Sequence, residues 1–308
     1  TAVNGYFSDR WYAGTGGTAV VNGNTVSGYL ELDVTTADTS VAASDLGYLY
    51  QPIEGFNTAD LLIGTASAKT ITISFKHKHT KTGINCCALI NSASNRNYIF
   101  EYTQSVANTE ETHSETITLD TSGTWIGATN GIGLKVFFTT FSGTTYHGSA
   151  ETWQAGNLLA TSNQVNNMDS VSNFFRITDV QLEEGTVATE FEYRHYGTEL
   201  ALCQRYCQLL GQSFVGTAEA TTYIAFNEKF QFTMRAAPSI SVVGGQTCNI
   251  RHAGADVNNS SPVLVAPSSS INSLWTLVSG FTGLTAGADI QARNNAANTL
   301  FILASGEL

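Results

Sequence analysis

The sequence predicts an all-β protein of antiparallel sandwiches with one short helix between them. Apolar and polar residues alternate with a period of two in many short segments, which is the pattern of half-buried strands. Gly, Asn and Ser turn residues separate these segments at short intervals, which is typical of antiparallel sandwiches and not of alternating strands and helices. One segment, residues 198–210, has a helical pattern instead. We therefore expect two β domains joined by a helix.

The first 197 residues contain the predicted strands of the larger sandwich. Residues 70–79 alternate clearly and place Ile71, Ile73 and Phe75 on one face. Residues 132–141 are apolar on both faces, so we expect a central strand there. Further predicted strands cover residues 97–102, 112–120, 173–183 and 189–194.

The predicted helix over residues 198–210 has recognisable ends. Thr198 is a suitable N-cap, Glu199 lies in the first turn, where the helix dipole favours it, and Gly211 ends the helix. An apolar stripe along it predicts a packing face. The stripe consists of Leu202, Cys203, Tyr206, Leu209 and Leu210. We expect this linking segment, residues 198–211, to pack on the chain's own sandwiches or on other copies of the chain.

Residues 212–308 predict a second, smaller β-sandwich. Trp275 alternates with Leu277 inside an apolar strand, so we expect its side chain in the core. Residues 258–270 are rich in Ser, Asn and Pro and predict a long surface loop. The predicted strands are residues 221–234, which form two strands around a turn, 239–243, 273–281, 288–293 and 299–304.

The composition excludes several classes of protein. The chain has 308 residues, a formal net charge of −11 and no basic run beyond Lys76, Lys78 and Lys81, which argues against binding to nucleic acid. Its 42% hydrophobic content excludes global disorder. No apolar run approaches the ~20 residues of a membrane span, and residues 1–12 lack the features of a signal peptide. The five cysteines have no paired spacing, which predicts buried free thiols in a protein that is made in a reducing cytoplasm.

Residues 180–206 (VQLEEGTVATEFEYRHYGTELALCQRY) closely resemble a segment of bacteriophage fibre and other virion surface proteins. In those proteins the first half of the segment closes a carbohydrate-binding-module-like jelly roll and the second half opens the linking helix. Three shorter resemblances lie in the same order along the chain. They are Asp9-Arg10-Trp11, residues 153–156 (WQAG) and residues 234–238 (MRAAP).

The resemblance implies a jelly roll over residues 1–197, a helix over 198–211 and a β domain over 212–308. It also implies a homotrimeric tail or head fibre, made in the host cytoplasm and exposed on the virion surface. Its partners would be itself, other virion proteins and host surface glycans. Such proteins often carry an N-terminal virion anchor, whereas this jelly roll begins almost at Thr1. Attachment by another route, a truncated chain and a role on the capsid surface all stay open.

Glycan binding needs exposed aromatic rings, because the C–H faces of sugars stack on them while neighbouring polar groups bind the hydroxyls. Several such copies on one particle would make weak contacts effective through avidity. The sequence offers five candidate rings, namely Trp11, Tyr12, Trp125, Tyr146 and Trp153.

Two metal sites are conceivable from the sequence. His77 and His79 share one face of a strand and could reach one ion, with His113, His147 or His195 as a third ligand. The alternative is a strand end near solvent in which Lys and His alternate. The resemblance to carbohydrate-binding jelly rolls implies a structural calcium, for which residues 33–45 supply carboxylates without the spacing of an EF-hand. We expect no other cofactor.

Catalysis is not expected. Carboxylate pairs such as Glu110 with Glu111 and Glu183 with Glu184 could serve a polysaccharide depolymerase, but an acidic chain offers such pairs by chance. The sequence has no G-x-S-x-G, P-loop or dinucleotide fingerprint. We expect a non-enzymatic glycan-binding virion protein, with a capsid decoration protein as the first alternative and a depolymerase as the second.

Overall fold

The computed structural model describes residues 4–210, 214–243, 247–292 and 302–307. Strands hold 51% of the residues and helices 6%, which confirms the predicted all-β fold. The chain forms two compact units, one ending at Tyr193 and the other comprising Arg194–Glu307. Within the described residues, no helix has the length and apolar character needed to cross a bilayer.

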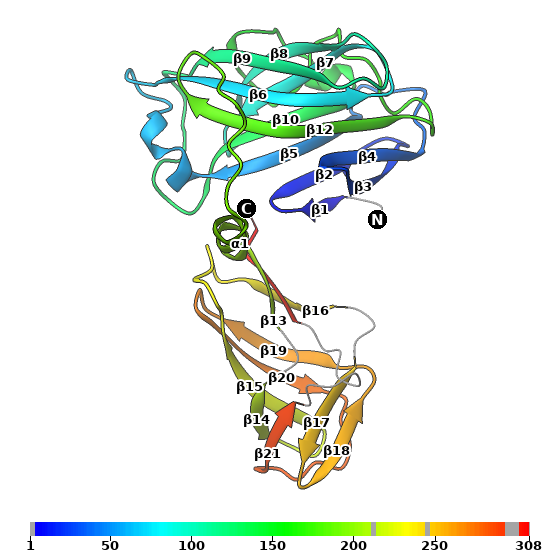
Figure 1. The fold of residues 1–308 in the computed structure, drawn as a ribbon, viewed down its shortest axis with the longest axis vertical. Helices are drawn as coiled ribbons and strands as arrows, with labels where there is room; N and C mark the ends of the chain where they lie inside the picture. The colour runs from blue at the N-terminus through cyan, green and yellow to red at the C-terminus, as the bar shows by residue number, and fades with distance from the viewer. Residues whose placement is uncertain (1–3, 211–213, 244–246, 293–301, 308) are drawn as a thin grey trace. The chain divides into compact units, whose positions relative to one another are not determined.

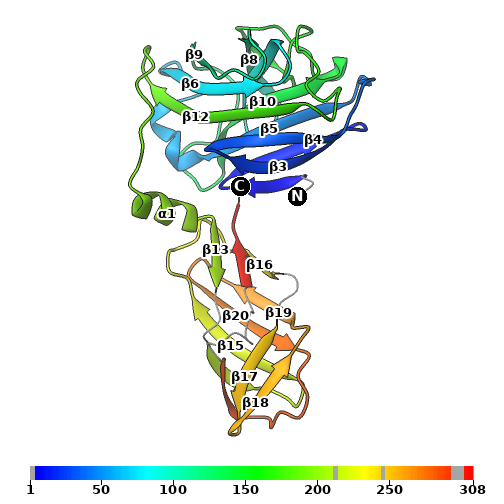
Figure 2. The same cartoon turned by 45° about the vertical axis from the view of Figure 1, so that its right-hand side comes forward.

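The first unit is a sandwich of two antiparallel sheets (Figures 1 and 2). The seven-stranded sheet has the order β1 (Gly5–Ser8), β2 (Trp11–Thr15), β5 (Leu46–Glu54), β10 (Ile132–Ser142), β7 (Gly83–Ile90), β8 (Arg96–Gln104) and β11 (Trp153–Ala155). The five-stranded sheet has the order β3 (Val20–Val26), β4 (Tyr29–Thr36), β12 (Phe174–Glu184), β6 (Thr70–His79) and β9 (Glu111–Thr118). Three short 3-10 helices lie in the connections, namely η1 (Gly55–Asn57), η2 (Ala59–Leu61) and η3 (Thr144–Tyr146).

The main core lies between these two sheets. Ile71, Ile73 and Phe75 point into it from β6, as their alternation predicts. Phe75 meets Phe138 of the opposite sheet edge to face, with ring centroids 4.9 Å apart. Such contacts between large rings fix the two sheets against each other in addition to the area that they bury.

A second, smaller apolar cluster lies on the outer face of the seven-stranded sheet. Residues 143–165, which we call the cover segment, pack Leu159 and Ala160 over Cys86 and Ile99. The Thr139 hydroxyl donates to the Leu159 carbonyl oxygen at 2.8 Å and ties the segment to β10. The cover segment thus buries the part of the outer face formed by β7, β8 and β10, while the outward tyrosines of β1, β2 and β5 are only partly buried.

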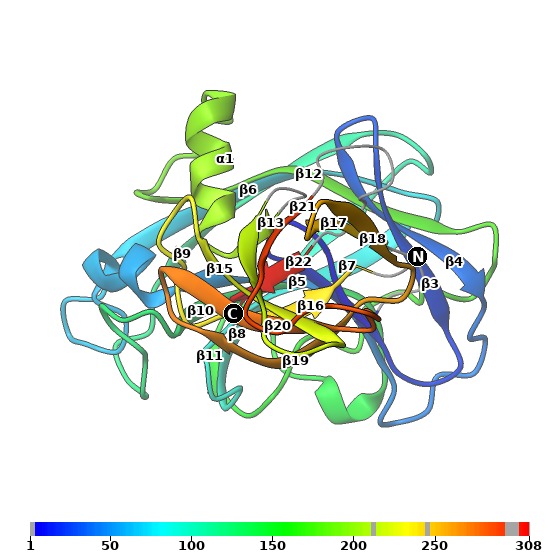
Figure 3. The ribbon, with the colours of Figure 1, turned by 90° about the horizontal axis from the view of Figure 1, so that it is seen from below.

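The second unit also contains two antiparallel sheets. A three-stranded sheet has the order β13 (Cys207–Leu210), β22 (Ile302–Ser305) and β16 (Ser239–Val242). A seven-stranded sheet has the order β18 (Ala255–Asn259), β17 (Cys248–His252), β21 (Asp289–Ala292), β14 (Val215–Ala218), β15 (Tyr223–Lys229), β20 (Ser273–Ser279) and β19 (Val263–Ser269). The edge strand β18 and its neighbour β17 are seen side by side in Figure 3. Phe214 stacks on Phe226 in the core of this unit, with centroids 4.1 Å apart.

The helix prediction over residues 198–210 was wrong in extent. The helix α1 spans Tyr196–Gln204, with His195 and not Thr198 at its N-cap, and Cys207–Leu210 forms β13. The backbone of β13 pairs with β22, so its amide and carbonyl groups bond across the sheet and cannot continue a helix. The predicted stop at Gly211 lies outside the described residues.

The proposed oligomerisation stripe is therefore divided. Leu202 and Cys203 lie on α1, whereas Leu209 and Leu210 lie on β13 and Tyr206 lies between the two elements. Tyr206 and Leu210 are buried, while Leu209 is 57% exposed. The five side chains do not form one helical face.

Four further predictions need correction. The two strands expected over residues 221–234 are one strand, β15, which runs through the expected turn. Residues 189–194 form no strand; there the Thr189 amide donates to the Glu183 carboxylate at 2.9 Å. The loop expected at 258–270 contains β19, an edge strand. Trp275 is 40% exposed, because it and Leu277 face away from the core while Leu274 and Val278 point inward.

Candidate functional site

Four tyrosines gather on the outer face of the first unit's seven-stranded sheet. Alternation along each strand turns Trp11 and Leu49 into the core and leaves the tyrosines on the opposite face. Strand pairing places Tyr6 opposite Tyr12 and Tyr12 opposite Tyr50. The group, which we call the tyrosine face, consists of Tyr6, Tyr12, Tyr48 and Tyr50.

The rings of the tyrosine face contact one another. The ring centroids of Tyr6 and Tyr12 lie 5.3 Å apart, those of Tyr12 and Tyr50 lie 5.2 Å apart, and those of Tyr48 and Tyr50 lie 5.8 Å apart. Phe137 of β10 closes the group by stacking on Tyr50. The result is a continuous aromatic surface across four neighbouring strands.

Gly14 makes room for one of these rings. Gly14 lies opposite Tyr48 in the pairing of β2 with β5. A Cβ atom at Gly14 would lie 2.7 Å from the Tyr48 ring and from its hydroxyl oxygen, closer than carbon atoms approach in proteins. The glycine therefore lets the Tyr48 ring lie over β2.

A cleft of about 450 Å³ opens where the tyrosine face meets the cover segment. Tyr146 and Leu159 line it from the cover segment, and Tyr48, Tyr50 and Phe137 line it from the sheet. Its other main lining residues are polar, namely Asn4, Thr15, Ser44, Ser94, Lys135 and Asn157. Among the residues that the structure describes, the lining includes no carboxylate. Aromatic rings with a few converging polar groups are the usual make-up of a small-molecule site.

The polar groups of the cleft are held in defined protonation states. Burial, together with the nearby Tyr12, Tyr50 and Tyr146, raises the pKa of Tyr48 to about 12. Burial also raises the pKa of Tyr50. Both hydroxyls therefore stay protonated at neutral pH and can donate as well as accept hydrogen bonds. Burial lowers the pKa of Lys135, whose ammonium donates to the Ser92 carbonyl oxygen at 3.1 Å and to Ser94 Oγ at 3.0 Å.

The structure brings two of the five predicted rings to this region. Tyr12 belongs to the tyrosine face, and Tyr146 lines the cleft. Trp11 does not serve there, because its side chain packs in the core against Phe138 and is only 9% exposed. Tyr6, Tyr48, Tyr50 and Phe137 were not predicted, although Tyr48-Leu49-Tyr50 alternates as a half-buried strand does.

Trp125 and Trp153 lie away from the cleft. Trp153 belongs to β11, at the sheet edge opposite β1, and pairs with the core residue Tyr98. The two indole rings meet edge to face with centroids 5.5 Å apart. The Trp153 ring N–H donates to the Thr118 carbonyl oxygen at 2.8 Å. Because these contacts hold both rings against the core, the expectation that they bind glycan with Tyr12 is not supported by their position.

His77 and His79 lie in the sandwich core and not near solvent, since they continue the inward row of Phe75 on β6. His77 Nδ1 bonds Gln104 Oε1 at 3.0 Å. His79 Nε2 bonds the Tyr102 hydroxyl at 3.2 Å, and its Nδ1 accepts the Arg176 amide at 3.3 Å. Both ring nitrogens of His79 are thus used by the protein, which does not fit a shared metal ion.

The other candidate histidines do not complete a metal site. His113 is partly buried, and its ring contacts Phe75 and stacks on Phe100. His147 Nε2 lies 3.1 Å from Ser142 Oγ at the cover segment, and His195 occupies the N-cap position of α1 in the second unit, with no capping hydrogen bond from its side chain. Burial lowers the pKa of His79 well below its usual value and that of His113 to about 4, so both rings are neutral at pH 7.

The residues at 33–45 do not fit the calcium that the resemblance implies. The Asp38 carboxylate accepts the backbone amides of Thr18 at 3.0 Å and Ser40 at 3.1 Å. Asp45 Oδ2 accepts the Ala42 amide at 2.7 Å. Backbone N–H groups thus take the oxygen positions that a cation would need, and these aspartates serve to hold the loop.

Two of the carboxylates considered for catalysis have similar structural roles. Glu111 accepts the amides of Ser105 at 2.9 Å and Val106 at 2.7 Å, which fixes the turn between β8 and β9. Glu183 accepts the amide of Thr189, a bond that lowers its pKa. Neither side chain lines the tyrosine-faced cleft.

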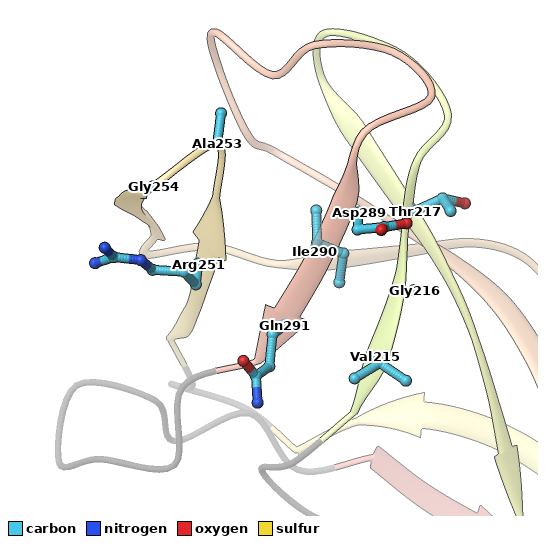
Figure 4. A pocket seen from close by; sticks show the side chains of 9 residues that line it. All are labelled: Val215, Gly216, Thr217, Arg251, Ala253, Gly254, Asp289, Ile290 and Gln291. Atoms are coloured by element: carbon cyan, nitrogen blue, oxygen red, sulfur yellow. The ribbon is translucent and has the colours of Figure 1, made fainter.

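The second unit has a larger and shallower hollow of about 750 Å³ on β14, β17 and β21 (Figure 4). Figure 4 shows Thr217 and Asp289 beside each other on neighbouring strands. Arg251 pairs with Asp256 at 3.3 Å. No aromatic ring lines this hollow among the described residues, so it lacks the surface on which a sugar ring would stack.

Comparisons with known proteins add distant likenesses. No family model matches the chain, and no curated protein matches it. A carbohydrate-binding module of family 4 aligns with 57% of this chain and 95% of its own, at 16% identity and a TM-score of 0.30. A family 11 carbohydrate-binding module from Clostridium thermocellum aligns with 62% of this chain and 94% of its own, at 15% identity and a TM-score of 0.32.

A third structure is the enzymatically active domain of tailspike protein 4 from bacteriophage CBA120. It aligns with 57% of this chain but only 19% of its own, at 11% identity and a TM-score of 0.31. The fold described above rests on this chain's own sheets and register.

Proposed function

We propose that this protein is a non-enzymatic virion surface protein of a bacteriophage that binds host surface glycans through the tyrosine-faced cleft. The observation that carries the glycan proposal is the aromatic surface of four tyrosines and Phe137 beside a cleft of about 450 Å³. Sugar rings stack on such surfaces, while Ser44, Ser94 and Asn157 offer hydroxyl and amide partners. The resemblance of residues 180–206 to phage fibre proteins supports the virion role.

Each cleft is expected to bind weakly, since hydrogen bonds from a sugar to its hydroxyl and amide groups replace bonds of similar strength to water. A homotrimer on a particle with many copies would convert weak contacts into firm attachment, because linked sites bind at high effective concentration. Sedimentation of the purified chain tests this part: a mass of three times 32.9 kDa supports the trimer, and a monomer overturns it.

The glycan proposal is tested by titrating purified protein with polysaccharides from host cells and with defined oligosaccharides, followed by calorimetry. Tyr48→Ala and Tyr50→Ala should each weaken binding by about tenfold, which corresponds to ~1.4 kcal/mol. Phe56→Ala is the matched control, because Phe56 is 55% exposed on η1 and does not line the cleft. Thermal unfolding verifies that each variant is folded.

Three results would overturn the proposal. Folded protein that binds none of the host saccharides, but copurifies with capsid subunits, would favour a capsid decoration role. Release of reducing ends from a bound polysaccharide would make the protein a depolymerase. Equal loss of binding in Phe56→Ala and Tyr50→Ala would move the site away from the cleft.

A further inference from the structure

Lys135 is the charged group of the cleft. It lies on β10 two residues before Phe137, so both side chains are on the outer face of the sheet. Its side chain is partly buried, and its ammonium donates to Ser92 O at 3.1 Å and to Ser94 Oγ at 3.0 Å. Both acceptors are uncharged, so neither neutralises the lysine.

Three of the four other lysines of this unit are neutralised, whereas Lys78 has no ion pair among the described residues. Lys69 pairs with Glu184 at 2.7 Å, Lys76 pairs with Asp179 at 2.9 Å, and Lys81 pairs with Asp169. No ion pair joins Lys135 to an acidic side chain in the part of the chain that the structure describes. The contrast is marked because the protein carries 25 acidic residues against 14 Lys and Arg.

An ammonium in this position is suited to an anion. Lysine carries three N–H donors, and the two bonds to Ser92 and Ser94 leave the third for a ligand. Partial removal of the charge from water is unfavourable, and burial lowers the pKa of Lys135 accordingly. A bound anion would restore the interaction that burial removes, whereas a neutral ligand would not.

Resting on the proposed glycan-binding function, we propose that the cleft selects acidic saccharides, with Lys135 Nζ donating to a carboxylate or sulfate on a sugar whose ring stacks beside Tyr50. The aromatic surface supplies binding common to neutral and acidic sugars, and Lys135 supplies the preference. Because the lysine ammonium acts as a point charge and not as a planar fork, it accepts either kind of anionic group.

The test compares matched trisaccharides that differ only in charge. Hexuronate and hexose trisaccharides of the gluco, galacto and manno series, and sulfated forms of the hexose trisaccharides, are titrated into wild-type protein. For the series that binds, the acidic member should bind about tenfold more tightly than its neutral counterpart, as expected for one hydrogen bond to a charged group. The sulfated arm shows whether the preference covers anions in general or carboxylates alone, and either pattern supports the inference.

Variants assign the preference to one residue. Lys135→Gln, and Lys135→Met, which keeps the apolar stem, should abolish the tenfold ratio between the affinities for the acidic and the neutral trisaccharide. Lys78→Gln is the matched control, because it removes the same charge from β6 of the opposite sheet. It should leave the acidic-to-neutral ratio unchanged.

The outcomes separate this inference from the proposed function. Equal binding of acidic and neutral trisaccharides, unchanged by Lys135→Gln, overturns the inference and leaves glycan binding standing. An acidic preference that Lys78→Gln removes as well as Lys135→Gln also overturns it, since the effect would then be one of net charge. Folded protein that binds no saccharide of the panel overturns both.

Discussion

The phenyl ring of Phe137 stacks on the ring of Tyr50, with centroids 4.6 Å apart and planes inclined by 15°. This contact joins β10 to β5 on the outer face of the sheet, where the two residues lie opposite each other in register. Phe137 is buried while Tyr50 is half-buried, so one face of the Tyr50 ring is supported by protein. Tyr50 is thereby held in place before any ligand arrives, which reduces the entropy lost on binding.

The Tyr50 ring and its hydroxyl are expected to contribute separately. Tyr50→Phe keeps the stack on Phe137 and should weaken saccharide binding only severalfold, through loss of one neutral hydrogen bond of about 1 kcal/mol. Tyr50→Ala removes the stacking surface as well and should weaken binding by tenfold or more, about 1.4 kcal/mol or above. Calorimetric titration of both variants measures the difference. If both lost affinity equally, the hydroxyl and not the ring would carry the interaction.

Gly14→Ala should disturb the cleft by displacing the Tyr48 ring, which lines it. Its new Cβ would lie 2.7 Å from Tyr48, so the ring must move off β2. We expect a loss of about 1–2 kcal/mol in the free energy of unfolding, because crowding of this kind costs that much in packed regions, together with weaker saccharide binding. Gly5→Ala is the control, since nothing lies within 4 Å of a Cβ placed there. Chemical denaturation compares the two, and equal effects would contradict the steric reason.

Stability should fall in mild acid because of the buried histidines. Burial lowers the pKa of His77, His79 and His113 below the ordinary 6.5, to about 4 for His113. The unfolded chain therefore binds more protons than the folded chain between pH 6.5 and about 4. The stability present above pH 6.5 should be lost progressively as the pH falls through this window, before most carboxylates titrate. Denaturation midpoints measured from pH 7.5 to 4 check the slope.

Replacing one of these histidines should flatten that slope. His113 stacks on Phe100 with planes inclined by 10°, so a phenyl ring fits the same place. His113→Phe should retain stability at pH 7 and gain up to about 3 kcal/mol relative to wild type near pH 4, since each pKa unit corresponds to ~1.4 kcal/mol. His195→Gln, at an exposed position, is the control. An unchanged slope in His113→Phe would assign the acid sensitivity to other groups.

A buried ion pair should contribute far more than an exposed one. Arg96 Nε lies 2.5 Å from Asp120 Oδ2 and Arg96 Nη2 lies 2.9 Å from Asp120 Oδ1, a two-point contact in which the Asp120 side chain is 3% exposed. Asp120→Ala should cost about 2–3 kcal/mol, because it removes a two-point, charge-assisted contact whose carboxylate is buried, while the Arg96 side chain, 24% exposed, is left to water and Ser122.

The matched comparison uses the pair of Lys81 and Asp169, whose side chains are about one-third exposed. Asp169→Ala should cost ~1 kcal/mol or less, since water and salt screen an exposed pair. Urea denaturation gives both values. Similar losses in the two variants would mean that burial does not govern the strength of the Arg96 contact.

Period-two patterns were sufficient to predict the core of the first unit. The inward row Ile71, Ile73 and Phe75 followed from alternation, and the same parity extends to His77 and His79. The alternative that places these histidines near solvent was wrong, because their position in the inward row of β6, and not their polarity, determines their burial. Here hydrogen bonds to Gln104 and Tyr102 compensate for the burial of two polar rings.

The parts that sequence reasoning missed depend on contacts between distant segments. Residues 207–210 have a helical pattern, yet their strand partner lies almost a hundred residues away at Ile302–Ser305. An outward tyrosine lines a cleft only where the cover segment leaves it uncovered. The alternation of residues along one strand does not indicate where that segment lies. Tyr146 could be named as an aromatic candidate, but its position against Tyr48 could not be predicted.

The cover segment gives the cleft two walls of different origin. The floor made by Tyr48, Tyr50 and Phe137 belongs to strands whose backbones are committed to the sheet. The opposite wall, with Tyr146 and Asn157, belongs to a connection outside the ladder. Substitutions or changes of length around Asn157 can reshape this wall without altering any backbone hydrogen bond between β5 and β10. A lineage of such proteins can therefore diverge in what it recognises while its framework stays the same.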